Sequence, residues 1–175
     1  MATTIKTFNS EGGFGINETT LVTKTLDVQN VNTFMLKNSN YTDANKKDYI
    51  LRGLNTSILT LDGTIPIILT SGTVNFITGY LLAVNPDGSG LYSVKIESAV
   101  SCSSSGSVSV LSELITVLKD SIPDGQTWSV SSYTGGLSNQ FSYTTVRGGT
   151  SLVIKWISNV QVVSVVWWQP LNNIE

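Results

Sequence analysis

The sequence is poor in the residues that most often carry catalysis and metal binding. It has no histidine among its 175 residues, which argues against histidine acid–base chemistry and against His/Cys zinc sites. Its single cysteine, Cys102, excludes an intramolecular disulfide, and the flanking serines provide no base, so we expect a passive, partly buried thiol. These absences predict no catalytic residue, no metal site and no cofactor.

Charge is also scarce, at 13% of the residues, and the formal net charge is −2. The ten lysines and arginines are scattered along the chain and form no basic stretch that would bind a phosphate backbone. No apolar run approaches the roughly 20 residues needed to cross a bilayer, and the N-terminus lacks the apolar segment of a signal peptide. We therefore expect a protein made in the cytoplasm, with no nucleic-acid partner and no membrane insertion.

Serine, threonine and asparagine are abundant: they supply 58 of the 175 residues and favour strands, turns and caps over helix interiors. From residue 56 onward, short apolar runs alternate with turn sequences such as Asp62-Gly63 and Asp87-Gly88, where glycine permits a positive φ and aspartate closes the turn. The pattern predicts strands at 57–61, 64–69, 73–84, 91–102, 108–118, 126–133, 140–147, 150–157 and 160–168. Many short strands with regular turns indicate an all-β fold, either an antiparallel sandwich or a barrel, and we favour the sandwich.

Apolar side chains alternate with polar ones in three of these runs, which predicts one buried face for each strand. The residues assigned to the buried faces are Tyr92, Val94, Ile96, Trp128, Val130, Phe141 and Tyr143. The polar residues between them, such as Ser142 and Thr144, are assigned to the exposed faces. The run 108–118 fits a helical stripe as well as a strand, and its β-branched residues favour the strand.

Residues 1–55 differ in composition from residues 56–175. They carry half of the charged residues of the chain and too few apolar residues to bury a core of their own. We interpret 1–55 as an extended N-terminal arm that docks on a partner, and 56–175 as the β-sandwich domain. Within the arm, residues 39–52 are the best candidate for a short helix.

The last apolar run, residues 160–168, is apolar on both faces. One protomer's core can cover only one face, so the other is covered either by the N-terminal arm or by another subunit. A similar run at 76–84 adds weight to burial in an oligomer, which we expect to be a homotrimer. The hypothetical subunit interface comprises Phe14, Ile16, Leu26, Val28, Val31, Val163, Val165 and Trp167.

Four segments resemble parts of virion structural proteins of tailed bacteriophages, in particular fibre, collar and baseplate-associated proteins. They are residues 11–17 (EGGFGIN), 26–31 (LDVQNV), 122–128 (IPDGQTW) and 141–147 (FSYTTVR). The resemblance implies a non-enzymatic assembly protein of the virion, whose N-terminal arm docks on other virion proteins and whose jelly-roll-like C-terminal domain faces outward. The chain lacks the long repetitive shaft of a tail fibre, which favours a short appendage, a collar or baseplate component, or a capsid decoration protein.

Two other functions compete with this interpretation. A carbohydrate- or receptor-binding module would expose aromatic residues in its turns, and Tyr92 and Tyr133 are its best candidates for contact with a cell-surface glycan. A hydrolase would need two carboxylates that converge on a cleft. The closest carboxylate pair in the β region, Asp120 and Asp124, brackets a proline-containing turn, and we assign it to that turn.

Overall fold

The computed structural model describes residues 14–16, 19–22, 33–37, 43–135 and 139–167 of the chain. These residues form strands and turns, with no helix among them, so the predicted all-β class is confirmed for the described part. The chain divides into two compact units, Met1–Asn32 and Thr33–Glu175. The first contains one antiparallel pair of short strands, β1 (Phe14–Ile16) and β2 (Thr19–Val22).

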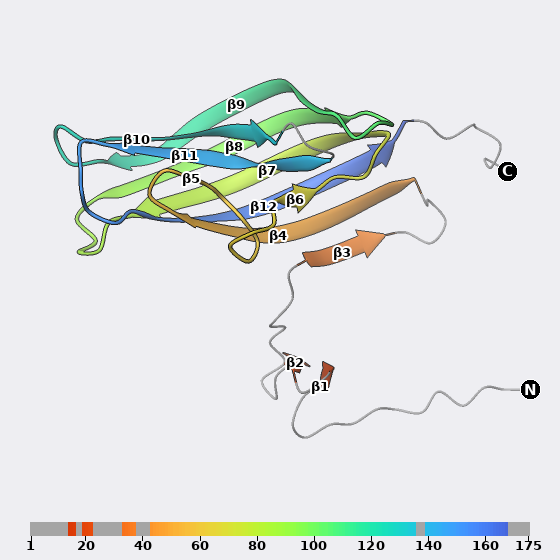
Figure 1. The fold of residues 1–175 in the computed structure, drawn as a ribbon, viewed down its shortest axis with the longest axis horizontal. Helices are drawn as coiled ribbons and strands as arrows, with labels where there is room; N and C mark the ends of the chain where they lie inside the picture. Colours follow the sequence, from red (N-terminus) through yellow and green to blue (C-terminus); the bar gives the residue numbers. More distant parts are fainter. Residues whose placement is uncertain (1–13, 17–18, 23–32, 38–42, 136–138, 168–175) are drawn as a thin grey trace, which may run out of the picture. The chain divides into compact units, whose positions relative to one another are not determined.

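The second unit is built on a six-stranded antiparallel sheet (Figure 1). In spatial order its strands are β3 (Thr33–Lys37), β4 (Ala44–Leu54), β12 (Lys155–Val166), β7 (Thr73–Val84), β8 (Leu91–Cys102) and β9 (Val108–Ser121). The last strand in sequence, β12, lies between β4 and β7 and pairs with both along nearly its whole length. The C-terminal strand therefore ties the early strands of the unit to the β7–β8–β9 meander.

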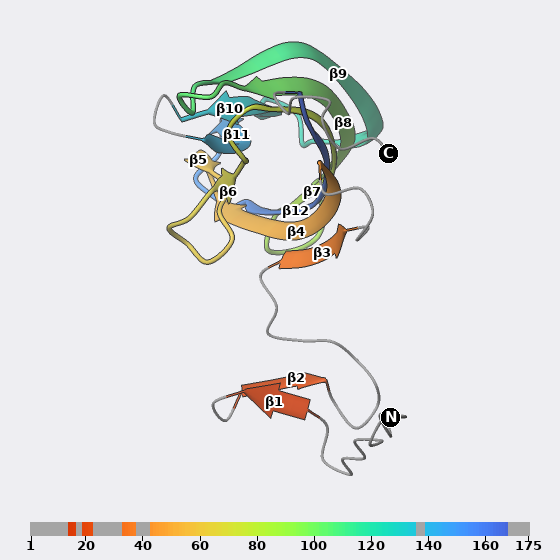
Figure 2. The same cartoon turned by 90° about the vertical axis from the view of Figure 1, so that its right-hand side faces the viewer.

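A smaller antiparallel sheet covers one face of the larger one. It consists of β10 (Thr127–Thr134), β11 (Gln140–Gly148), β5 (Ser57–Ile58) and β6 (Ile67–Ile68), with both short strands paired to β11. The view along the strands shows the six-stranded sheet curving around the interior, with the smaller sheet at the side between its two ends (Figure 2). Both contribute to a single hydrophobic core, in which Trp128 of β10 meets Trp156 of β12 edge to face, with ring centroids 6.4 Å apart.

The turns form where glycine and aspartate predict them. In the β7–β8 hairpin, Gly88 has a φ of +74°, and Asp87 Oδ1 accepts hydrogen bonds from Ser89 N and Ser89 Oγ at 2.9 and 2.8 Å. At the end of β9, Asp120 Oδ1 accepts a hydrogen bond from Ile122 N at 3.1 Å, as its predicted turn role requires. The observed bounds of β7 and β8 consequently agree with the predicted strands 73–84 and 91–102.

The preference for a strand over a helix at 108–118 is confirmed, since these residues lie in β9. The predictions 126–133 and 140–147 match β10 and β11 to within one residue at each end. The division of the C-terminal region into strands 150–157 and 160–168 is wrong. β12 instead runs without a break through Ser158 and Asn159, and the small side chain of Ser158 is fully buried on the core face.

The prediction of a short helix at 39–52 is also wrong, because β4 begins at Ala44. This strand contributes Tyr49 and Leu51 to the core and pairs with β12 from Ala44 to Leu54. A core strand therefore lies inside the segment interpreted as an arm, and the compact unit begins at Thr33 rather than at residue 56.

The predicted strand faces are confirmed on β8 and β10, where Tyr92, Val94, Ile96, Trp128 and Val130 are buried. On β11, Phe141 and Tyr143 are buried as predicted, but the assignment of Ser142 to an exposed face is wrong. Ser142 is fully buried, and its hydroxyl is satisfied there by donating a hydrogen bond of 2.5 Å to the carbonyl oxygen of Leu59, on the segment that leads from β5. Both faces of β11 are thus covered at this position.

Candidate functional site

Large apolar side chains remain exposed on the face of the six-stranded sheet that points away from the core, which we call the outer face. Along β7, the buried side chains of Ile77 and Leu81 alternate with the exposed side chains of Phe76 and Leu82. The same alternation occurs along β12. Because directly paired residues of antiparallel strands share a face, the register of β4, β12 and β7 collects these side chains into patches.

Two apolar patches lie toward opposite ends of the outer face. In the first, Phe76 is paired with Val163, and Val74 is paired with Val165. In the second, Leu82 is paired with Ile157, and β4 adds its own exposed side chains alongside. We call them the Phe76 patch (Val74, Phe76, Val163 and Val165) and the Leu82 patch (Ile50, Leu54, Leu82 and Ile157).

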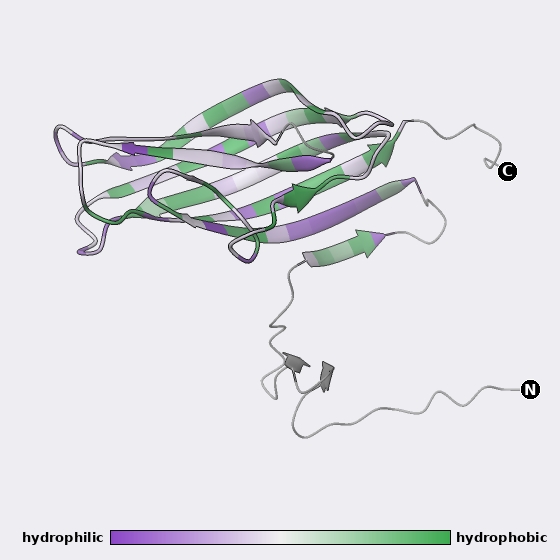
Figure 3. Ribbon diagram, in the orientation of Figure 1, coloured by the Kyte–Doolittle hydropathy of each residue, from purple (hydrophilic) through white to green (hydrophobic). Residues whose placement is uncertain are grey.

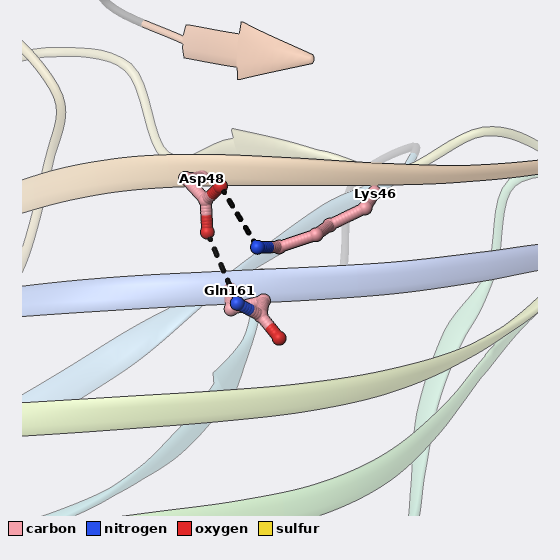
Figure 4. A network of polar contacts seen from close by, with 3 residues as sticks. All are labelled: Lys46, Asp48 and Gln161. Carbon is pink, nitrogen blue, oxygen red and sulfur yellow. Dashed lines mark hydrogen bonds and ion pairs between the residues drawn. The ribbon is translucent and has the colours of Figure 1, made fainter. Parts of the chain in front are cut away.

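A polar band crosses the outer face between the two patches. Lys46 Nζ lies 3.4 Å from Asp48 Oδ2, and Gln161 Nε2 donates a hydrogen bond of 3.3 Å to Asp48 Oδ1 (Figure 4). On β8, Lys95 Nζ lies 3.0 Å from Glu97 Oε1, and this hydrogen bond raises the pKa of Lys95. Each lysine of the band thus has an acidic neighbour, and a partner placed over the band would leave none of these charges unpaired.

An open pocket of about 820 Å³ adjoins the Leu82 patch and is lined in part by Leu54, Leu82 and Ile157. Its lining contains one carboxylate, that of Asp62. Asp62 Oδ1 accepts hydrogen bonds from Thr64 N, Thr64 Oγ1 and Ile65 N, and these bonds lower the pKa of Asp62. A single carboxylate engaged in a turn lacks the second carboxylate that glycosidase chemistry requires.

The hypothetical interface residues are only partly brought together. Val163 and Val165 lie in the Phe76 patch and are 39% and 47% exposed, and Trp167, just beyond β12, is 58% exposed. Phe14 and Ile16 lie in β1, in the other compact unit. Leu26, Val28 and Val31 lie outside the described residues. The structure therefore groups Val163 and Val165 on the outer face and leaves Trp167 exposed just beyond the strand.

The two candidate glycan contacts, Tyr92 and Tyr133, would need exposed rings to stack on a sugar. Tyr92 is only 8% exposed, and burial, followed by the charge of Asp120, raises its pKa. A buried ring cannot stack on a sugar, so the assignment of Tyr92 as a glycan contact is wrong. Tyr133 is partly exposed near the end of β10. Cys102 is fully buried, more completely than the partly buried thiol that the sequence predicts, and burial raises the pKa of its thiol.

One exposed apolar feature was missed in the sequence. Both edge strands of the six-stranded sheet, β3 and β9, expose several large apolar side chains. In β9 every residue from 111 to 120 is exposed. The alternation of side chains shows which residues share a face, but it does not show which strand lies at an edge, so the sequence carried no direct signal of this exposure.

Comparisons of the chain with protein-family models, with curated proteins and with solved structures found no match. Within the described ranges, no three acidic or cysteine side chains come together as metal ligands would. None of the described segments forms an apolar helix of bilayer-spanning length.

Proposed function

We propose that this chain is a non-enzymatic structural component of a tailed-phage particle, of the short fibre, collar, baseplate or decoration type, and that it works as a homo-oligomer. The observation that carries the proposal is the exposure of the Phe76 and Leu82 patches on one face of a single sheet. Contiguous apolar patches rimmed by polar residues are typical of interaction surfaces. The geometry thus favours a function in assembly over one in chemistry.

The free energy available from burying exposed apolar side chains supports burial of the outer face in an assembly. Phe76 is 52% exposed, and burying the remaining half of such a side chain stabilises by on the order of 1 kcal/mol. The two patches together contain eight apolar side chains, and the polar band between them is already paired internally. A partner would therefore gain apolar burial without leaving a charge of the band unpaired.

The proposal also includes the sandwich arrangement of the two sheets, the role of the N-terminal segment and the number of subunits. Two antiparallel sheets that share one core support a β-sandwich, and its jelly-roll-like character stays a prediction. We propose that the N-terminal part of the chain docks on other virion proteins. Because β3 and β4 belong to the six-stranded sheet, this docking role is confined to the part that precedes Thr33. We propose a trimer that is made in the host cytoplasm and then incorporated into the virion.

Glycan binding is the alternative function, and its case is weakened by the burial of Tyr92. Its remaining candidate is Tyr133, which lies in the covering sheet and not on the outer face. The two functions are separable, because a glycan contact at Tyr133 would be lost in Tyr133→Ala while assembly through the outer face would persist. A glycan-binding screen of the native chain and Tyr133→Ala would detect this activity.

The phage role is tested by asking whether the chain is part of an assembled particle. Phage particles are purified by density gradient from the cells that make the chain, and their proteins are identified by mass spectrometry. The proposal expects the chain to sediment with the particles in a fixed ratio to the capsid protein. Recovery of the chain only in the fractions of free protein, with intact particles that lack it, would overturn the proposal.

A further inference from the structure

The two edges of the six-stranded sheet are complementary to each other. β3 and β9 are its first and last strands and lie at opposite ends of the curved sheet (Figure 2). Each pairs with a neighbour on one side only among the described residues. Because six strands alternate in direction, β3 and β9 run in opposite directions. The sheet of a second copy, added in the same orientation, would therefore bring its β3 antiparallel to β9.

Both edge strands expose apolar side chains that a lone chain leaves in water. Phe34, Met35 and Leu36 of β3 are each more than half exposed, and Figure 3 shows this hydrophobic stretch beside the hydrophilic first half of β4. In β9, Leu114 is 60% exposed and Ile115 is 37% exposed. Long apolar edges are templates for pairing with another chain unless something covers them.

The strand faces of β9 are known from its pairing with β8. Glu113 is paired with the buried Ser98 and Ile115 with the buried Ile96, so both lie on the core side of the sheet. Leu114, which is paired with Glu97, lies on the outer side. Register shifts leave Leu111 and Leu118 without a direct partner on β8, so the segment from 112 to 117 between them is regular.

The strand faces of β3 follow from its pairing with β4. Thr33 is paired with the buried Tyr49, so Thr33, Met35 and Lys37 lie on the core side. Phe34 and Leu36 lie on the outer side, since Leu36 is paired with Lys46 of the outer face. β3 is five residues long, and the regular segment of β9 offers it a site of matching length.

We infer that a second copy of this chain adds its β3 to β9, with Lys37 of the second copy opposite Glu113. In this register Leu36 faces Leu114 on the outer side, and Met35 faces Ile115 on the core side. Phe34 and Thr33 then oppose Thr116 and Val117, and all five pairs place both residues on the same side of the sheet. The pairing joins opposite charges at one end and apolar residues in the middle, which are the cross-strand pairs that stabilise a sheet. The inference rests on the proposed self-assembly and names its partner.

The carboxylate of Glu113 can make this contact while it keeps a hydrogen bond within its own chain. Its Oε2 accepts a hydrogen bond from Ser132 N of β10 at 2.9 Å, which leaves Oε1 to accept from the lysine of the second copy. Because the contact joins two different edges, it is a head-to-tail contact. Such contacts close into a ring when the rotation between copies allows it and otherwise extend into a filament. A ring of three copies would meet the expectation of a trimer.

Disulfide trapping in the full chain tests the register directly. Leu36→Cys and Leu114→Cys in one chain place the two new thiols at directly opposed positions of neighbouring copies, where their Cβ atoms would be about 4.5–5.5 Å apart. Four strands separate β3 from β9, so a bond between these positions joins two chains. We expect a ladder of cross-linked dimers and higher species under mild oxidation, which a reductant removes. The matched control, Leu36→Cys with Ile115→Cys, points its second thiol to the opposite face and should give little product.

A charge exchange provides the second test. Lys37→Glu and Glu113→Lys, each alone, place like charges opposite one another and should weaken assembly about fivefold or more. The two substitutions together should restore it to near the native level. Lys119→Glu lies outside the register and serves as the matched control, since it changes charge equally and should leave assembly unchanged.

The outcomes separate this inference from the proposed function. The β3–β9 contact would be overturned if the chain is oligomeric by light scattering but the 36/114 and 36/115 variants cross-link equally. Failure of the double charge exchange to restore assembly in an oligomeric chain would overturn it too. Either result would leave the proposed assembly role standing. A chain that is monomeric at every concentration and gives no cross-link would contradict both. Selective cross-linking together with charge rescue would support the contact.

Discussion

Gly79 of β7 lies against the ring of Tyr143 of β11, so closely that a Cβ at position 79 would stand 2.5 Å from Tyr143 Oη. This contact joins the two sheets at the centre of the core, and it explains why a residue without a side chain occupies the middle of a long central strand. The hydroxyl of Tyr143 is buried without a hydrogen-bond partner among the described residues.

We therefore predict that Gly79→Ala lowers the free energy of unfolding by about 1–3 kcal/mol, because its methyl group forces the two sheets apart. Tyr143→Phe removes the nearest atom and an unsatisfied hydroxyl, so it should be near neutral alone and should recover part of the loss in the double variant. Urea denaturation of the four chains measures both effects. Native stability in Gly79→Ala would contradict the contact.

The assignment of β4 to the core makes a prediction about truncation. A chain that begins at Thr33 should fold as the full chain does, because all strands of the second unit are retained. A chain that begins at residue 56 should not fold, because it lacks β4 and with it the buried Tyr49 and Leu51. Circular dichroism and a cooperative thermal transition distinguish the two. Cooperative unfolding of the shorter chain would refute the role given to β4.

Buried tyrosines should limit stability at high pH. Burial raises the pKa of Tyr49 to about 12, and burial, with a smaller effect of the charge on Glu113, raises that of Tyr143 above its usual value of about 10. Above pH 10 the unfolded chain loses these protons while the folded chain keeps them, so the unfolded state is favoured. Stability should be fully present below pH 10 and should fall as the pH rises toward 12.

The measurement is the urea midpoint between pH 8 and pH 12. Tyr49→Phe should flatten the decline, whereas Tyr80→Phe, which changes an exposed tyrosine, should leave it as in the native chain. A midpoint that stays constant up to pH 12 in the native chain would show that these hydroxyls do not control its alkaline stability.

Adjacent valines of β12 provide a matched pair that separates folding from assembly. Val163→Asp places a carboxylate on the outer face, where the side chain is 39% exposed, so stability should change by less than about 1 kcal/mol while association weakens. Val162→Asp buries a carboxylate in the core and should destabilise by about 3 kcal/mol or more. Denaturation and light scattering of both variants test this contrast. A Val163→Asp chain that associates as the native chain does would remove the Phe76 patch from the interface.

Some strands could be predicted from residues close together in the sequence, namely turn residues and alternating apolar and polar side chains. The bounds of β7 and β8 follow from the turn residues beside them and from the strict alternation of Tyr92, Val94 and Ile96 with polar residues. The exposed face of β12 was anticipated in Val163 and Val165, because an apolar strand with two apolar faces cannot bury both against one small core.

Other features depend on partners distant in sequence. β4 begins at Ala44 and continues with the polar residues 45–48, and its place in the sheet comes from pairing with β12, more than 100 residues later. Ser158 resembles a turn residue but is held in the core face by strands on both sides. The complementarity of β3 and β9 appears only when the strand order makes both of them edges.

The most direct test of the account is the solution mass of the full chain, measured by light scattering after size exclusion over a wide range of concentrations. Association through the outer face and the sheet edges predicts a mass that is a multiple of 18.8 kDa, three times that value for a trimer, with a smaller mass for Val163→Asp at the same concentration. A mass of 18.8 kDa at every concentration, with no change on substitution at position 163, would contradict the claim that this chain acts by self-assembly.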